Sequence, residues 1–164
     1  MNYLEEAESW CEENESPKVQ LCCGKEKIDG YIGVDLVRKN GVDIIRDLNK
    51  EWPFESESVG LFLAKNALEY LNDPLHSMKE IHRCLKPDGY TLIQVPSTNG
   101  KAAFENPLHK SYWNINSFSY YTNNDLAEYI DLTAKFNLID AREYYSSEQC
   151  EQTQRLYVGV VLRK

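Results

Sequence analysis

The sequence predicts an α/β fold, in which a mostly parallel, mixed sheet ends in a C-terminal antiparallel hairpin. Five short runs rich in Val, Ile and Leu lie between residues 18 and 97, and most are apolar at consecutive positions. That pattern is typical of strands covered on both faces of a parallel sheet. A clear amphipathic helix separates the fourth run from the fifth, and the last two apolar runs follow each other across a polar turn. Crossovers followed by a hairpin give a mixed sheet.

The predicted strands follow one another in a regular order. The five parallel strands are KVQLCC (18–23), YIGVDL (31–36), GVDIIRDL (41–48), VGLFLAKN (59–66) and YTLIQVPS (90–97). The hairpin strands are NLIDAREYY (137–145) and RLYVGVVLR (155–163). A sheet of this kind binds ligands outside the carboxyl ends of its parallel strands. We therefore expect one crevice, bordered by the loops after Cys23, Leu36, Leu48, Asn66 and Ser97.

Two helices are predicted from periodicity and end signals. The first spans residues 74–86, with Asp73 as its N-cap, and its apolar face is formed by Leu75, Met78, Ile81 and Leu85. Lys86 is expected in the last turn, with Pro87 and Gly89 ending the helix. The second predicted helix covers residues 123–136.

Composition limits the class of protein. The 164 residues contain 42% hydrophobic residues, enough for one domain, which we place at 18–164 behind an acidic segment at 1–17. A net charge of −8 argues against a nucleic-acid partner. No run of 18 apolar residues occurs and the first residues are acidic, so we expect a cytoplasmic protein without a membrane segment. The five cysteines have no CxxC spacing, which argues against disulfides and a zinc site.

The first crossover is unusually short. Only six residues, KEKIDG, separate Gly24 from Tyr31, and seven extended steps reach at most about 23 Å, so the link has room for a single turn at most. The G-x-G-x-x-G pattern that opens a helix onto a pyrophosphate is missing, which disfavours NAD and FAD. Without a helix, the loop also lacks a helix dipole for binding an anion, and Lys25 or Lys27 is a candidate replacement.

From about Lys18 to Thr122 the chain resembles the class I S-adenosylmethionine-dependent methyltransferases, which have a Rossmann-like fold. LCCGKEKIDGYIGVDL resembles the glycine-bearing first loop and the acidic end of the second strand in that family. The run from RDLNKEW to TLIQVP resembles its third to fifth strands, and LKPDG is close to a common L-K-P-G-G. The shortened first crossover and the single glycine depart from the family pattern. The resemblance implies S-adenosyl-L-methionine as cofactor.

The resemblance assigns roles to residues at the ends of the strands. Asp35 corresponds to the ribose-binding acid and Asp47 to the residue that meets the adenine amino group, with Leu48 beside the ring. The residues expected to bind the cofactor are Cys23, Gly24, Asp35, Leu36, Asp47, Leu48, Asn66 and Ala67. Carboxylates and hydrogen-bonding groups suit a cationic sulfonium that carries a ribose and an adenine. The alternative is that both aspartates are polar strand ends without a ligand.

The segment 96–122 is long, polar and aromatic, as substrate loops often are. It resembles a methyltransferase subgroup associated with glycan and polysaccharide biosynthesis. His109 is the candidate general base for methyl transfer to a hydroxyl, because an imidazole titrates near neutral pH. Candidate substrate residues are Asn106, Tyr112, Trp113, Asn114, Tyr120 and Tyr121. The alternative is that His109 and Asn114 only fix the loop and that the aromatic residues belong to the core.

The predicted function is S-adenosylmethionine-dependent methyl transfer, most specifically O-methylation of a small molecule or of a sugar or glycan precursor. The alternative is a degenerate methyltransferase fold that serves as a binding or scaffold module. Glu105 and His109 lie four residues apart but lack a third ligand, so no metal site is predicted. An open cofactor crevice in a small domain also makes a homodimer an expectation.

Overall fold

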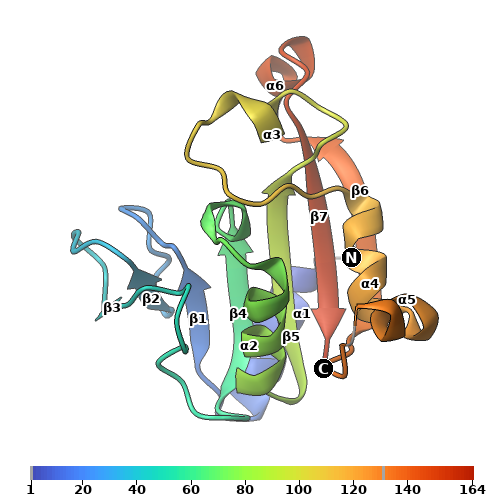
Figure 1. The fold of residues 1–164 in the computed structure, drawn as a ribbon. Helices are drawn as coiled ribbons and strands as arrows, with labels where there is room; N and C mark the ends of the chain where they lie inside the picture. The colour runs from blue at the N-terminus through green and yellow to red at the C-terminus, as the bar shows by residue number, and fades with distance from the viewer. Residues whose placement is uncertain (1, 131) are drawn as a thin grey trace.

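The computed structural model describes residues 2–130 and 132–164. Seven strands form one sheet in the order β3-β2-β1-β4-β5-β7-β6. Helix α1 (Tyr3–Glu13) covers one face, and α2 (Pro74–Cys84) lies on the other, together with the short helices α4 (Ser119–Thr122) and α5 (Asn124–Tyr129) (Figure 1). The predicted α/β fold is confirmed.

The strands agree with the expected runs, mostly with tighter bounds. Five are parallel: β1 (Lys18–Leu21), β2 (Ile32–Asp35), β3 (Ile44–Ile45), β4 (Val59–Lys65) and β5 (Leu85–Pro96). The last two, β6 (Asn137–Tyr145) and β7 (Leu156–Arg163), are antiparallel to each other, and β7 also pairs antiparallel with β5. The C-terminal hairpin is therefore confirmed, and its connection contains the short helix α6 (Glu148–Gln152).

Helix α2 starts as predicted and ends earlier. The Asp73 carboxylate accepts hydrogen bonds from the backbone N–H groups of Leu75 and His76, which is the expected N-cap. The prediction that Lys86 lies in the last helical turn is wrong, because the helix ends at Cys84 and Leu85 already pairs with Val59 of β4. The stretch LKPDG thus opens strand β5.

The predicted helix 123–136 is also shorter in the structure. Helix α5 spans only Asn124–Tyr129, capped by the side chain of Asn123. Leu132 and Phe136 are then buried in the core while the chain runs back toward β6, and the Phe136 N–H donates to the Tyr121 carbonyl. Residue 131 of the predicted helix lies outside the described residues, and residues 132–136 are not helical.

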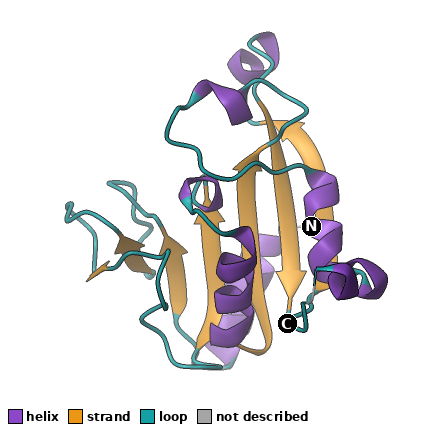
Figure 2. Ribbon diagram, viewed as in Figure 1, coloured by secondary structure: helices purple, strands orange, loops and turns teal. Residues whose placement is uncertain are grey.

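Two hydrophobic clusters enclose the sheet. The larger one fills the space between the sheet and α2, and it includes Phe62, Ile81, Trp113 and Phe118. The smaller one lies under α1, where Ala7 and Cys11 face the sheet. Figure 2 shows the layers of helix and sheet clearly. The segments that follow β4 and β5 lie beyond the carboxyl ends of these strands, and below we call this end of the parallel strands the edge of the sheet. That edge carries the candidate site.

Candidate functional site

The first loop is fixed to the end of β2 by a carboxylate. Asp35 is buried, and its Oδ2 atom accepts a hydrogen bond of 2.9 Å from the Gly24 N–H, while Oδ1 accepts one of 3.1 Å from the Val37 N–H. Gly24 has a φ of +58°, and no atom lies within 4 Å of the position that a Cβ would take. This loop therefore leaves open space directly beside a buried carboxylate.

Side chains take over the task of the missing crossover helix. The Gln20 amide, on β1, donates to the Glu26 carbonyl at 3.1 Å and accepts from the Ile28 N–H at 2.8 Å. At the far end of the link, Lys27 Nζ lies 3.0 Å from Asp43 Oδ2. The link between β1 and β2 is thus held against the sheet without helical turns.

The two lysines of the link differ in their surroundings. Lys27 is engaged by Asp43, which also accepts a hydrogen bond of 2.7 Å from the Gly33 N–H. The Gly33 N–H and the Lys27 ammonium together lower the pKa of Asp43. Lys25 is exposed and forms no ion pair within the described part of the chain. Of the two, Lys25 has its charge available for a ligand.

The other predicted cofactor residues occupy three kinds of environment. Asp47 accepts hydrogen bonds of 3.0 Å from the N–H and the Nδ2 of Asn49, and these bonds lower its pKa. Leu48 is buried in the core, and Leu36 has 63% of its surface exposed. Asp47 and Leu36 are therefore accessible at the strand ends, whereas Leu48 has only a small exposed surface.

The last three predicted cofactor residues, Cys23, Asn66 and Ala67, differ in burial. Cys23 and Ala67 are buried, with 4% and 0% of their surface exposed. Asn66 follows β4 with a φ of 50°, and its Oδ1 accepts a hydrogen bond of 3.4 Å from Gln94. Asn66 also lines a cavity beyond the ends of β4 and β5. It therefore lies between the predicted cofactor residues and this cavity.

This cavity has a volume of about 420 Å³ and lies over the ends of β4 and β5. Its lining residues come from the segment that follows β4, the end of β5, the segment that follows β5, and the start of β7. Its polar or ionisable lining residues are Asn66, Glu69, Tyr70, Glu105, Asn106, His109, Arg155 and Tyr157. The cavity therefore offers many hydrogen-bonding groups to a polar ligand.

His109 is the predicted base, and it is held in one orientation. Its ring is buried, packs edge to face with Tyr70 at 5.2 Å, and places Nδ1 2.9 Å from the Ala103 carbonyl. A carbonyl oxygen can only accept, so Nδ1 carries the proton in the neutral ring and Nε2 keeps its lone pair. Nε2 has no hydrogen-bond partner among the residues that the structure describes. That nitrogen is available as a proton acceptor.

Glu69 is a site residue that the sequence reading did not single out. It lies in the 3₁₀ helix η1 (Leu68–Tyr70), which follows β4, and only 2% of its surface is exposed. Neither carboxyl oxygen has a hydrogen-bond partner among the described residues. Burial raises the pKa of Glu69 to about 7. In the sequence, Glu69 could have been recognised as the single acidic residue of the stretch NALEY, which directly follows a buried strand.

The predicted substrate residues separate into two groups. Asn106 donates from Nδ2 to the Tyr70 hydroxyl at 2.9 Å and lines the cavity. Tyr112 and Tyr120 are exposed and line a separate hollow of about 270 Å³ next to α2. These three side chains are accessible to a ligand, although they face two different depressions.

The other three substrate candidates stabilise the segment itself. Trp113 is buried, stacks on Phe118 at 5.2 Å, and donates from Nε1 to Ser111 Oγ at 2.9 Å. Asn114 caps the 3₁₀ helix η2 (Ile115–Phe118). Burial of Tyr121 in the core raises its pKa to about 12. Their contacts support the core alternative for these residues.

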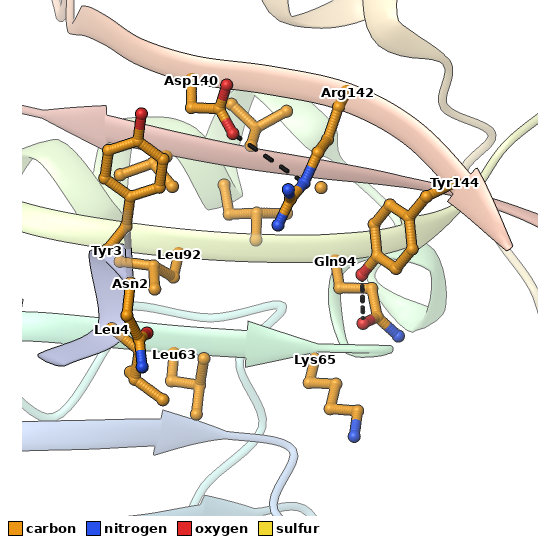
Figure 3. Close-up of a pocket in the computed structure, with 14 residues that line it drawn as sticks. Asn2, Tyr3, Leu4, Leu63, Lys65, Leu92, Gln94, Asp140, Arg142 and Tyr144 are labelled. Atoms are coloured by element: carbon orange, nitrogen blue, oxygen red, sulfur yellow. Dashed lines mark hydrogen bonds and ion pairs between the residues drawn. The ribbon is translucent and has the colours of Figure 1, made fainter. Parts of the chain in front are cut away.

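A further hollow of about 230 Å³ lies on the sheet face beside the N-terminus of α1 (Figure 3). Its floor is formed by side chains of β4, β5 and β6, and Tyr144 donates from its hydroxyl to Gln94 Oε1 at 2.6 Å. Arg142 and Asp140 face each other there at 3.9 Å. This hollow lies on the face of the sheet and contains none of the predicted site residues.

Two classes of site or segment are missing from the part of the chain that the structure describes. No group of three or more His, Cys, Asp or Glu residues there is arranged to hold a metal ion. No helix in residues 2–130 and 132–164 is long and apolar enough to cross a membrane.

Comparisons with known proteins agree with this geometry. Residues 31–93 match the family model described as a methyltransferase domain, and the match begins directly after the shortened crossover. No curated protein matches the chain. A methyltransferase from Mesorhizobium loti, described as S-adenosylmethionine dependent, has a TM-score of 0.64 at 16% identity, covering 90% of each chain.

Two further solved structures have similar scores. One is an S-adenosylmethionine-dependent methyltransferase from Archaeoglobus fulgidus, with a TM-score of 0.63, 13% identity, and coverage of 98% of this chain and 94% of that one. The other is the Burkholderia thailandensis 1,6-didemethyltoxoflavin-N1-methyltransferase, solved with S-adenosylhomocysteine (TM-score 0.61, 18% identity, 96% and 76% coverage). The chain has the class I methyltransferase fold.

Proposed function

We propose that this protein is an S-adenosylmethionine-dependent methyltransferase that methylates a hydroxyl group of a small molecule, with a sugar or glycan precursor as the acceptor class. The observation that carries the proposal is the orientation of His109. Its Nδ1 is bound to the Ala103 carbonyl, its Nε2 has no hydrogen-bond partner among the described residues, and the residue lines a polar cavity next to the cofactor edge. A fixed imidazole with an available lone pair suits the removal of a hydroxyl proton.

The residues at the cofactor edge fit the proposed ligand. Gly24 leaves space where a ligand can approach the backbone, and Asp35 can accept further hydrogen bonds from ribose hydroxyls, since each carboxylate oxygen has several lone pairs. Asp47 is accessible for the adenine amino group. Lys25 is the nearest free cation in the first loop for the methionine carboxylate. Together these residues provide groups for each end of the cofactor.

The acceptor cavity supplies the other half of the reaction. The bound cofactor provides an electrophilic methyl group on a sulfonium. His109 takes the hydroxyl proton at Nε2 as the acceptor oxygen forms its new bond to carbon, and the carbon–sulfur bond electrons go to sulfur. Asn106 and Tyr70 supply an amide and a hydroxyl that orient a polyhydroxylated acceptor. The polar lining favours such an acceptor over an apolar one.

The cofactor half is tested by isothermal titration with S-adenosylmethionine and S-adenosylhomocysteine. We expect micromolar binding of both, weakened by about 100-fold in Asp35→Asn, because a neutral amide replaces a charge-assisted acceptor of the ribose hydroxyls. Asp140→Asn is the matched control, since Asp140 lies on β6 away from the strand ends. Absence of binding at millimolar concentration would contradict the proposal and favour a degenerate binding module.

The acceptor half is tested by screening monosaccharides and nucleotide sugars for release of S-adenosylhomocysteine. With an active acceptor, we expect His109→Gln to lower turnover by about 100-fold or more and to leave the affinity for S-adenosylmethionine within about twofold. Equal losses of turnover and cofactor affinity would contradict the role of His109 as base. His82→Gln serves as control, because His82 packs against Phe136, far from this cavity in the fold.

A further inference from the structure

Glu69 presents an unusual electrostatic situation. Its carboxyl group is buried, lines the acceptor cavity, and lacks a hydrogen-bond or ion-pair partner among the described residues. The basic side chain in the same cavity, Arg155, is already paired with Glu105 at 2.7 Å. Since an ionised carboxylate without a partner is costly to bury, the arrangement favours a cation that arrives with a ligand.

The place of Glu69 in the fold indicates which cation this is. It follows β4 by four residues, and the cavity that it lines also contains Asn66, which ends that strand next to the cofactor edge. Burial raises the pKa of Cys22, beside the first loop, to about 12, with the Asp35 and Glu69 carboxylates adding to the rise. The charge of Glu69 therefore acts on both the cofactor loop and the acceptor cavity.

A methyl donor must lie at this boundary, because its methyl group passes in line from the cofactor to the acceptor. We propose that the Glu69 carboxylate is the counter-charge for the sulfonium of the methyl donor. The inference rests on the proposed function and adds a consequence to it. Sulfur becomes neutral once the methyl group has left, so Glu69 then loses its partner and the product binds less tightly than the donor.

Other ionisable groups surround Glu69 and could also respond to pH. Those that line its cavity or act on its charge are Cys22, Tyr70, Glu105, His109, Arg155 and Tyr157. The cysteine and both tyrosines have raised pKa values, chiefly because of burial, and stay neutral near pH 7. His109 lies in the lining of the same cavity and is the remaining group of this set that the test has to control for. Any test must therefore separate Glu69 from His109.

The test compares the affinities of two ligands that differ in charge at sulfur. S-adenosylmethionine carries the sulfonium and S-adenosylhomocysteine does not, while their ribose, adenine and amino-acid groups are the same. At pH 8 we expect Glu69→Gln to weaken S-adenosylmethionine by at least about tenfold and to leave S-adenosylhomocysteine within about twofold. Equal effects on both ligands, or none on either, would overturn the proposal.

Two further measurements follow the ligand preference as a function of pH, so that the test does not depend on the Glu69→Gln affinities at pH 8 alone. In the unaltered protein, the preference for S-adenosylmethionine should fade as pH falls from 8 to 5.5, because protonation neutralises Glu69, whose pKa lies near 7. In Glu69→Gln the preference should be weak and independent of pH. A pH dependence that persists in this variant would assign the effect to a group other than Glu69 and overturn the proposal.

The matched control is Glu105→Gln, which removes a carboxylate of the same cavity that is already paired with Arg155. This variant should keep the preference for the charged ligand. Folding is checked by thermal unfolding, and Glu69→Gln should unfold at a higher temperature than the unaltered protein at pH 8, since it removes an unpaired buried charge. If neither ligand binds the unaltered protein, both proposals fail; if both bind with no effect of Glu69, only this one fails.

Discussion

The two halves of the candidate site are built in opposite ways. On the cofactor side, ten residues, 22–31, join β1 to β2, and side-chain bonds from Gln20 and Asp43 hold this link in place. On the acceptor side, the segment 97–122 carries its own buried aromatic side chains, among them Trp113 and Phe118. The first region depends on a few polar contacts, and the second depends on packing.

The difference shows which parts of a crossover this fold can lose. A helix between β1 and β2 would normally cover the sheet and direct its N-terminus at the ligand. Here the Gln20 side chain satisfies backbone groups of the link, so the edge keeps an ordered loop although no helix is present. The acceptor side also has polar contacts, such as the Asn114 cap of η2, but its Trp113 side chain is part of the main core. We therefore expect substitutions on the two sides to fail in different ways.

The largest expected effect is on the acceptor side. Trp113→Ala should lower the free energy of unfolding by about 3–5 kcal/mol, because it removes a buried ring and leaves a cavity in the main core. Chemical denaturation followed by circular dichroism measures this change. Trp113→Phe should cost clearly less, since it retains most of the stacking on Phe118 and loses the bond to Ser111. Equal losses in both variants would show that the hydrogen bond dominates.

A smaller effect is expected at the polar contact of the cofactor side. Gln20→Ala removes both hydrogen bonds to the link and should lower the free energy of unfolding by about 1–2 kcal/mol. The affinity for S-adenosylhomocysteine should fall at the same time, because the link is continuous with Gly24. Tyr144→Phe is the control on the same sheet, since it removes one hydrogen bond to Gln94 and none to the link. Unchanged ligand affinity in Gln20→Ala would separate the link from the cofactor site.

The smallest expected effect distinguishes the two lysines of the link. Lys25→Ala should weaken S-adenosylhomocysteine binding by about two- to fivefold at low salt, since exposed charge pairs contribute about 0.2–1 kcal/mol. The difference should shrink at 1 M salt because of screening. Lys27→Ala should affect mainly the stability of the link, because Lys27 is paired with Asp43. A larger loss of ligand affinity in Lys27→Ala than in Lys25→Ala would reverse this assignment.

Sequence reasoning was most successful where local pattern decides the structure. The strand runs and the cap at Asp73 depend on neighbours along the chain, and both are confirmed. It was wrong where a distant segment competes, as at Lys86, which joins β5 instead of ending a helix, and after Tyr129, where the predicted helix gives way to an irregular stretch. The contact roles of the site residues remain predictions that the experiments above test.

By itself, the sequence determined the order of strands along the chain, the terminal hairpin and the absence of a helix between β1 and β2. These features follow from apolar periodicity and from the length of a link, which are properties of adjacent residues. Only the tertiary structure decided that Trp113 is buried and that, among the described residues, neither His109 Nε2 nor the Glu69 carboxyl has a hydrogen-bond partner. Burial and hydrogen bonding of a side chain depend on segments that are distant in the sequence, so one local pattern is compatible with several environments.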